Sequence, residues 1–192
     1  RGDMMDALGG KGAGLAEMTN IGLPVPAGFT ITTEVCDYYY KNGKKYPAAF
    51  AEELSKNLQR LEKLTGKKLG DSEDPLLISV RSGSARSMPG MMETILNLGL
   101  NDRSIEGLAK KTNNRRFVLD AYRRFIVMYG ATAMGVPRKE FDDEFDEIKE
   151  VRTRARLNIR TAKVQDTVVN EEELGELIPK LKAVYKEHAK KD

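Results

Sequence analysis

The stretch with the most chemistry lies between two short apolar runs. The first run, residues 76–80, ends on Arg81, and a loop rich in Ser, Gly and Met follows it before a second run that ends at Leu98. Long loops without secondary structure of their own are uncommon in compact domains, and when ordered they usually bind ligands. An arginine at a strand end can hold a phosphate through two parallel hydrogen bonds. The stretch therefore predicts strand, loop and strand, with a polyphosphate as the ligand.

The loop itself combines close backbone approach with apolar side chains. Gly83 and Gly90 allow the backbone to lie against a ligand, because glycine has no Cβ. Met88, Met91 and Met92 either pack down onto a core or line a flexible apolar lid over the ligand, and the sequence leaves these two interpretations open.

A second candidate is Lys11, in the run LGGKGAG that precedes a helix expected at residues 15–22. Backbone N–H groups at a helix start can point at a phosphate, and the helix adds about half a positive charge there. The run is not a Walker A loop, because Met5 and Gly12 stand where that pattern needs Gly and Ser or Thr. By itself it fits either a phosphate site or a glycine-rich turn with a solvated lysine.

Composition excludes several classes of protein. The 192 residues are 40% hydrophobic and 32% charged, with no apolar run of membrane-span length and no signal-peptide core, so neither a membrane partner nor secretion is expected. The single cysteine rules out an internal disulfide, and the single histidine, which lies among lysines at the end of the sequence, speaks against a Ser-His-Asp triad and a multi-histidine metal site. We expect Cys36 in the core and His188 in solvent. The net charge of +3 suits an anionic ligand better than nucleic acid.

The first hundred residues alternate extended and helical patterns. Residues 23–27 are expected to be extended because of their prolines, residues 28–32 to form a strand, and Thr33 to cap a helix. A longer helix is expected between Pro47 and Gly66. Its apolar face comprises Phe50, Leu54, Leu58, Leu61 and Leu64.

Beyond residue 101 the patterns are helical. Helices are expected from a cap at Asn101 or Asp102 to Lys110, at 115–129, at 139–149 and after a cap at Asn170, with a kink or fresh start at Pro179. The expected inward residues of the second helix are Phe117, Ala121, Tyr122, Phe125, Met128 and Tyr129, and those of the third are Phe141, Phe145 and Ile148.

Two charged segments invite functional interpretations. The acidic side of helix 139–149 lacks histidine partners, so a solvated face is favoured over a metal site. Residues 151–169 carry four arginines and a lysine without a nucleic-acid-binding signature, so an exposed connector or docking face is favoured over RNA or DNA binding.

Three segments resemble the N-terminal part of the pyruvate, phosphate dikinase family. They are GGKGAGLAEMTNIGLPVPAGFTITTE at 9–34, DPLLISVRSGSARSMPGMMETILNLGLND at 74–102 and RFVLDAYRRFIVMYG at 116–130. The resemblance covers nearly all of the chain and is weakest at about 150–167. The related phosphoenolpyruvate synthases share the GGK start and the VRS strand end, but they differ in the loop that follows.

The resemblance implies an α/β (α+β) fold, namely an ATP-grasp nucleotide-binding lobe at residues 1–101 with an inserted all-helical lobe at 102–192. It also implies a phosphotransferase that converts ATP, phosphate and pyruvate to AMP, diphosphate and phosphoenolpyruvate through a phosphohistidine on a separate swivelling domain. Under the resemblance, Lys11 and Arg81 are the catalytic residues. The ATP and phosphate contacts are Lys11, Arg81, Gly90, Met91, Met92 and Thr94.

The resemblance also sets expectations for what lies outside these residues. The Mg²⁺ ligands are expected on a second ATP-grasp lobe beyond Asp192, as is the phosphohistidine domain, so the chain alone is expected to be inactive. The full-length enzyme is expected to be a cytoplasmic homodimer, with organelle targeting of a precursor left open. The alternative is a non-catalytic module that docks partners through the helical lobe.

Overall fold

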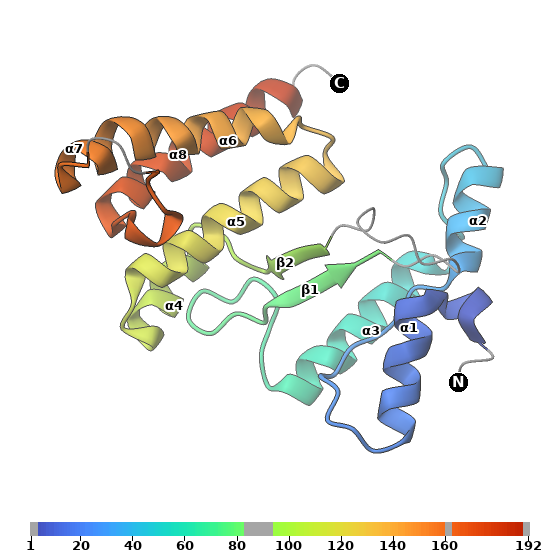
Figure 1. The fold of residues 1–192 in the computed structure, drawn as a ribbon. Coiled ribbons are helices and arrows are strands. Elements are labelled where there is room, and N and C mark those ends of the chain that lie inside the picture. The colour runs from blue at the N-terminus through green and yellow to red at the C-terminus, as the bar shows by residue number, and fades with distance from the viewer. Residues whose placement is uncertain (1–3, 83–93, 160–162, 190–192) are drawn as a thin grey trace. The chain divides into compact units, whose positions relative to one another are not determined.

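The computed structural model describes residues 4–82, 94–159 and 163–189. The chain divides into two compact units: unit 1 comprises residues 1–67 and 81–93, and unit 2 comprises residues 68–80 and 94–192. The sequence-based boundary between lobes at residue 101 stays a prediction. Within the described residues, helices dominate both units, and the strands form one small sheet (Figure 1).

In the described part of unit 1 the helices are α1 (Met5–Asn20), α2 (Thr33–Lys41) and α3 (Phe50–Thr65). The predicted end of α3 is confirmed, because Gly66 adopts the left-handed conformation that closes a helix (φ 68°, ψ 16°). The strand predicted at residues 28–32 is wrong: the segment between α1 and α2 is not part of a ladder. A strand needs a hydrogen-bonded neighbour, which its own sequence cannot supply.

Few apolar side chains are buried in the described part of unit 1. Ala13 and Leu61 are buried, whereas Leu64 on the predicted inward face of α3 is 66% exposed. Cys36 is exposed, so the prediction of a core cysteine is wrong. A series of ring contacts instead crosses the turn between α2 and α3: Tyr39 meets Tyr40 edge-on and Tyr46 at a tilt, and Tyr46 stacks on Phe50.

The sheet consists of β1 (Ile78–Arg81) and β2 (Thr94–Leu98), which pair with each other and run in opposite directions (Figure 1). β1 starts two residues later than the strand predicted at residues 76–80. Leu76 is buried ahead of β1, and Val80 within it is 42% exposed. Arg81 ends β1 as predicted. In unit 2, β2 packs on α5 (Arg115–Ala133).

The described part of unit 2 has further helical elements, and several of them pack with α5 into one hydrophobic core. The further elements are α4 (Ser104–Thr112), α6 (Arg138–Glu147), the π-helical η2 (Ile148–Thr153), α7 (Arg154–Leu157), the 3₁₀ turn η3 (Asp166–Val168) and α8 (Glu171–Ala189). Phe141, Phe145 and Ile148 are buried in that core, as predicted. Phe117 is 55% exposed, so its predicted inward position is wrong. The predicted helix 139–149 continues through η2 into α7.

The helix ends in unit 2 follow local side-chain chemistry. Asn101, rather than Asp102, accepts hydrogen bonds through Oδ1 from the amides of Arg103 and Ser104, both at 2.9 Å. The predicted fresh start at Pro179 is wrong, because α8 runs through this residue as one helix. In the described ranges, none of the helices is both long and apolar enough to cross a membrane.

Candidate functional site

Lys11 lies directly after a break inside α1. Gly9 is buried and has φ 67° and ψ 165°, a conformation that is open essentially to glycine alone. The helical path therefore stops at Gly9 and starts again at Gly10. The predicted helix at residues 15–22 is present, but the run LGGKGAG, predicted to precede it, lies inside α1, which extends from Met5 to Asn20.

The break changes which backbone groups can form helical hydrogen bonds. In an unbroken helix the amides of Gly10 and Lys11 would reach the carbonyl groups four residues earlier. The dihedral angles of Gly9 interrupt that pattern, so these two amides start a new helix and point out of it. Lys11 is exposed at the same place. Two amides, the positive end of a helix and an ammonium group together suit an anion.

Arg81, the second candidate, is exposed at the end of β1 and is grouped with Lys11 in unit 1. Thr94, the first residue of β2, is half-buried and belongs to unit 2. The other predicted ATP contacts, Gly90, Met91 and Met92, lie outside the described residues. So does Met88, whose two interpretations both stay open.

The acidic face of α6 is engaged in ion pairs at the surface. Lys139 Nζ lies 2.5 Å from Asp143 Oδ2, and Lys180 Nζ lies 3.3 Å from Glu144 Oε2 and 2.9 Å from Glu147 Oε2. Within residues 4–82, 94–159 and 163–189, no three acidic, His or Cys side chains are grouped so that they could hold a metal ion. These carboxylates therefore balance neighbouring cations on the surface.

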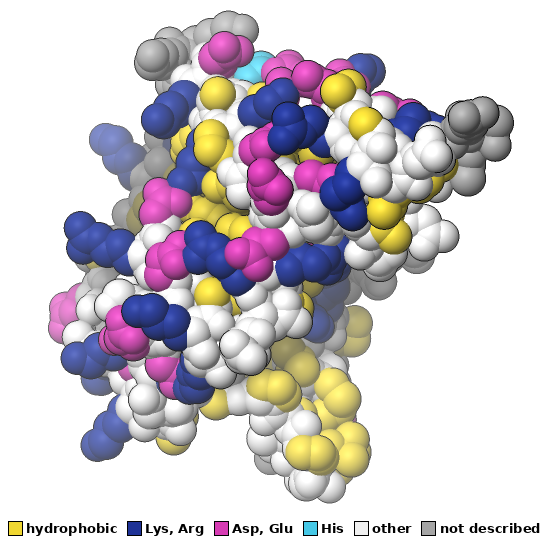
Figure 2. Space-filling model, turned by 90° about the vertical axis from the view of Figure 1, so that its left-hand side faces the viewer, with side chains coloured by type: hydrophobic (Ala, Val, Ile, Leu, Met, Phe, Trp, Pro, Cys, Tyr) yellow, Lys and Arg dark blue, Asp and Glu magenta, His cyan; other side chains and the backbone are white. Residues whose placement is uncertain are grey.

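Three arginines of the segment after α6 pair with acidic side chains, mostly at the surface. Arg152 pairs with Glu176 at 2.7 Å, Arg154 with Glu150 at 2.6 Å and Arg156 with Glu173 at 2.7 Å. Figure 2 draws one face of the molecule. On this face, Lys and Arg side chains are interspersed with Asp and Glu side chains and form no continuous basic stripe. Three cations of residues 151–169 are thus paired with carboxylates, whereas Arg160 lies outside the described residues, so the nucleic-acid interpretation, which needs clustered cations, stays untested.

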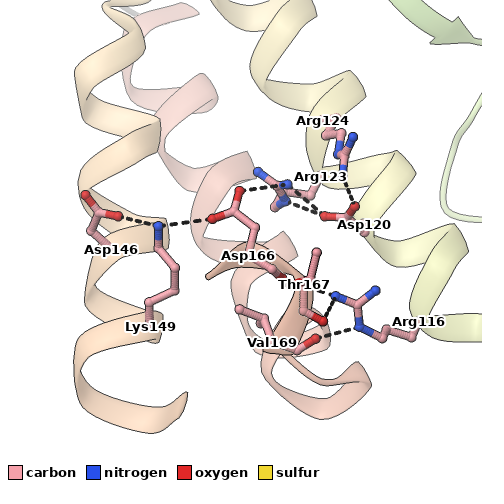
Figure 3. Close-up of polar contacts among 9 residues, drawn as sticks. All are labelled: Arg116, Asp120, Arg123, Arg124, Asp146, Lys149, Asp166, Thr167 and Val169. Atoms are coloured by element: carbon pink, nitrogen blue, oxygen red, sulfur yellow. Dashed lines mark hydrogen bonds and ion pairs between the residues drawn. The ribbon is translucent and has the colours of Figure 1, made fainter. Parts of the chain in front are cut away.

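Sequence reasoning missed a cluster of cations that holds the segment before α8 (Figure 3). Arg116 on α5 donates from Nε to the Val169 carbonyl at 2.7 Å, and from Nη2 to the carbonyls of Asp166 and Thr167 at 3.1 and 2.8 Å. One guanidinium group thus fixes the η3 turn through three backbone acceptors. In the sequence, an arginine on an amphipathic helix gives no sign of these carbonyl acceptors, which lie some fifty residues away.

Two further cations of this cluster are buried beside an aromatic ring. The Arg123 guanidinium and the Lys149 ammonium lie 4.2 and 4.6 Å from the ring centroid of Phe145. Asp166 approaches both cations, at 3.7 and 3.2 Å (Figure 3). Burial lowers the pKa of Lys149, but hydrogen bonds to Asp146 and Asp166 outweigh it and hold that pKa above the usual 10.5. The lysine therefore stays charged inside the helical unit.

His188 is not a solvated terminal side chain, contrary to the prediction. Its Nε2 lies 2.5 Å from Glu140 Oε2, and its side chain is 23% exposed. The contact joins the end of α8 to α6.

A hollow of about 540 Å³ lies where the N-terminal turns of α5 and α8 meet. It is lined by Arg115, Leu119, Asn170, Glu171, Glu172 and Gly175. Arg115 is held there by Glu106 and by Glu171, the latter at 3.4 Å. None of the predicted ATP contacts lines this hollow.

Comparison with known proteins gives the class of the chain first. A family model described as "Pyruvate phosphate dikinase, AMP/ATP-binding domain" matches residues 5–46, the range that contains the Gly9 break and Lys11. The pyruvate, phosphate dikinase of Clostridium symbiosum is 51% identical over 184 residues, which make up 96% of this chain and 20% of that protein. That of Entamoeba histolytica is 56% identical over 142 residues, 74% of this chain and 16% of the relative.

A plant relative agrees with these matches. The chloroplastic pyruvate, phosphate dikinase of Flaveria trinervia is 48% identical over 185 residues, 96% of this chain and 18% of the relative. The resemblance stated from the sequence is therefore confirmed: the chain is homologous to part of the pyruvate, phosphate dikinases. It spans about a fifth of the length of these relatives.

Proposed function

We propose that the chain supplies one wall of the ATP phosphate site of a phosphotransferase of the pyruvate, phosphate dikinase type. In this proposal Lys11 and Arg81 hold the phosphate chain, together with the backbone of Gly90, Met91, Met92 and Thr94. The whole enzyme passes a phosphoryl group from ATP through a phosphohistidine to pyruvate. The observation that carries the proposal is the Gly9 break, after which α1 starts again at Gly10, beside Lys11, inside the range matched by a nucleotide-binding family model.

The mechanism proposed for these residues is electrostatic. Phosphoryl transfer spreads negative charge over the transferring oxygens, and enzymes assist it chiefly by positioning and by charge stabilisation. Lys11 would meet a phosphate as a point charge, with the adjoining amides donating hydrogen bonds. Arg81 would grip two oxygens of one phosphate through its planar fork. Both residues would bind and orient the phosphates without exchanging a proton.

Mg²⁺ does not fit the described residues, which group no three suitable side chains. Its proposed ligands belong to a second ATP-grasp lobe, and the full-length enzyme is proposed to be a homodimer located in the cytoplasm or, from a targeted precursor, in an organelle. The lobes proposed for this chain are an ATP-grasp lobe at residues 1–101 and a helical lobe at 102–192.

The rival proposal of a non-catalytic docking module has less support. It relied on free acidic and arginine-rich surfaces, whereas Arg152, Arg154 and Arg156 are engaged by carboxylates of the same unit.

Calorimetry with Mg-ATP tests the proposal on the chain itself. A hydrogen bond to a charged group contributes about 1.5–3 kcal/mol, so two such residues fall short of the roughly 8 kcal/mol that micromolar affinity requires. We expect binding weaker than micromolar that Lys11→Ala and Arg81→Ala each reduce. Lys63→Ala, which changes an exposed lysine on α3, is the matched control.

Sub-micromolar affinity, or equal binding by all variants, would contradict the proposal. In a full-length enzyme carrying this sequence, Arg81→Ala is expected to remove most of the ATP half-reaction and to spare exchange between the phosphohistidine and pyruvate. An equal loss of both half-reactions would make Arg81 a structural residue.

A further inference from the structure

The Thr33 hydroxyl donates hydrogen bonds to carbonyl groups of α1 that lose their helical amide donors at the Gly9 break. Thr33 is the first residue of α2, and its hydroxyl donates to the carbonyl of Asp6 and, at a longer 3.4 Å, approaches that of Ala7. These carbonyls belong to the part of α1 that precedes the break. The sequence predicted Thr33 as a cap of its own helix, and that is wrong, because the N-cap position of α2 is Thr32.

The pairing follows from helix geometry. Counting four residues back, Gly10 would donate to Asp6 and Lys11 would donate to Ala7 if α1 were continuous. These are the two carbonyls that the Thr33 hydroxyl faces. The contact with the Ala7 carbonyl is part-buried, whereas the contact with the Asp6 carbonyl is exposed. Because a part-buried carbonyl is costly without a donor, the hydroxyl lowers the incentive for the helix to close over Gly9. The broken conformation leaves the two amides directed outward.

Thr30, in the segment that precedes α2, also packs against α1 just after the break. A Cβ built on Gly12 would lie 3.2 Å from Thr30 Cγ2 and 3.2 Å from Leu8 Cβ, so Thr30 packs closely over the first turn after the break. Ala13, one residue further, is 2% exposed. The segment holding Thr30 and Thr33 therefore seats the start of the new helix through packing and through a hydroxyl donor.

We propose that Thr33 is a positioning residue for the phosphate site: its hydroxyl holds α1 open at Gly9 so that the amides of Gly10 and Lys11 can bind phosphate. The inference rests on the proposed function, because it gives these amides a phosphate ligand. Thr33 acts through the backbone of α1 and does not touch the ligand.

The test compares Thr33→Val, which has nearly the same shape without a hydroxyl, with Thr33→Ser, which keeps the hydroxyl. Thr32→Val is the matched control, because the neighbouring Thr32 makes no side-chain capping bond. In each variant of the whole chain, ¹H–¹⁵N spectra report the amide shifts and hydrogen exchange of Gly10 and Lys11. Titration with inorganic tripolyphosphate and Mg²⁺ gives the affinity, and unchanged amide shifts in unit 2 verify folding.

In Thr33→Val we expect slower exchange at the Gly10 and Lys11 amides and an affinity lower by about fivefold, the equivalent of one ordinary hydrogen bond. Thr33→Ser and Thr32→Val should match the unchanged chain. Unaltered amides in Thr33→Val, or altered amides with unaltered affinity, would overturn the inference alone. If the unchanged chain shows no tripolyphosphate binding at these amides, the proposed function fails and the inference fails with it.

Discussion

Asn170 and Glu173 each accept a hydrogen bond from the other's backbone N–H at the start of α8. Asn170 Oδ1 lies 2.9 Å from the Glu173 nitrogen, and Glu173 Oε2 lies 2.8 Å from the Asn170 nitrogen. The reciprocal pair satisfies two amides at the helix start. Glu173 is 4% exposed and also binds the Arg156 guanidinium, so one carboxylate joins α8 to α7.

The stability of the helical unit is therefore expected to depend on the charge of Glu173. Burial raises the pKa of its carboxyl, but hydrogen bonds from Arg156 and the Asn170 amide outweigh burial and hold that pKa below the usual 4.5. A lowered pKa stabilises the folded state above about pH 4.5, and the contribution is lost as the pH falls through the folded-state value. We expect the free energy of unfolding to fall below that pH.

Urea denaturation followed by circular dichroism at neutral and acidic pH measures this effect. Glu173→Gln should lower the free energy of unfolding by about 1–3 kcal/mol at neutral pH and flatten its fall in acid. Glu172→Gln, an exposed neighbour in the same helical turn, is the control. Equal acid sensitivity in the two variants would show that Glu173 does not carry the effect.

Arg116 is expected to hold the η3 turn in place. Replacing it with Ala leaves the carbonyls of Asp166, Thr167 and Val169 without its guanidinium donors, which should cost about 1.5–3 kcal/mol. Arg116→Lys should recover little of the loss, because an ammonium group cannot reproduce the planar fork. Hydrogen exchange at residues 166–170 should quicken in both variants.

The control for Arg116 is Arg124→Ala on the same helix. Arg124 is 59% exposed and pairs with Asp120, and an exposed pair contributes about 0–1 kcal/mol. A loss from Arg124→Ala as large as that from Arg116→Ala would mean that general surface charge, and not the three carbonyls, accounts for the stabilisation.

Gly130 and Gly175 provide a matched pair inside helices. A Cβ on Gly130 of α5 would lie 2.5 Å from Phe141 Cζ, whereas a Cβ on Gly175 of α8 would meet nothing within 4 Å. Gly130→Ala should destabilise the unit by about 1–3 kcal/mol through overpacking. Gly175→Ala should stabilise it by about 0.5–1 kcal/mol, because alanine favours helix.

Thermal unfolding of both glycine variants measures these opposite shifts. Repeating Gly130→Ala in a Phe141→Leu background should reduce its penalty, since the ring that it meets is gone. A penalty that is unchanged in this background would contradict the clash with Phe141.

Local patterns predicted the elements of the helical unit well. The apolar spacing that placed Phe141 and Phe145 inward and the caps at Asn101 and Asn170 depends on residues within one or two helical turns. The same reasoning failed for Phe117 and for the strand at residues 28–32. In those cases the outcome depended on which neighbour, if any, packs or pairs with the segment.

The candidate site was likewise predicted only in part from the sequence. Residue types alone pointed to Lys11 and Arg81, and the glycine-rich run predicted a helix start after it, at residue 15. The sequence did not predict that the break falls at Gly9 itself, or that Thr33 from the next helix faces the carbonyls released there. The Met-rich part of the predicted loop lies outside the described residues, and its role stays a prediction.

The sequence by itself carried the resemblance to the pyruvate, phosphate dikinases, the approximate positions of the main helices of unit 2, and the two cations proposed for the phosphate site. Each of these follows from motifs or from contacts within a few residues. Only the tertiary structure decided that Arg152 and Arg156 pair with carboxylates of α8, that Arg116 holds the η3 turn, and that Thr33 faces α1. These contacts join residues distant in sequence, and the free energy of packing, which no local pattern records, selects the partners.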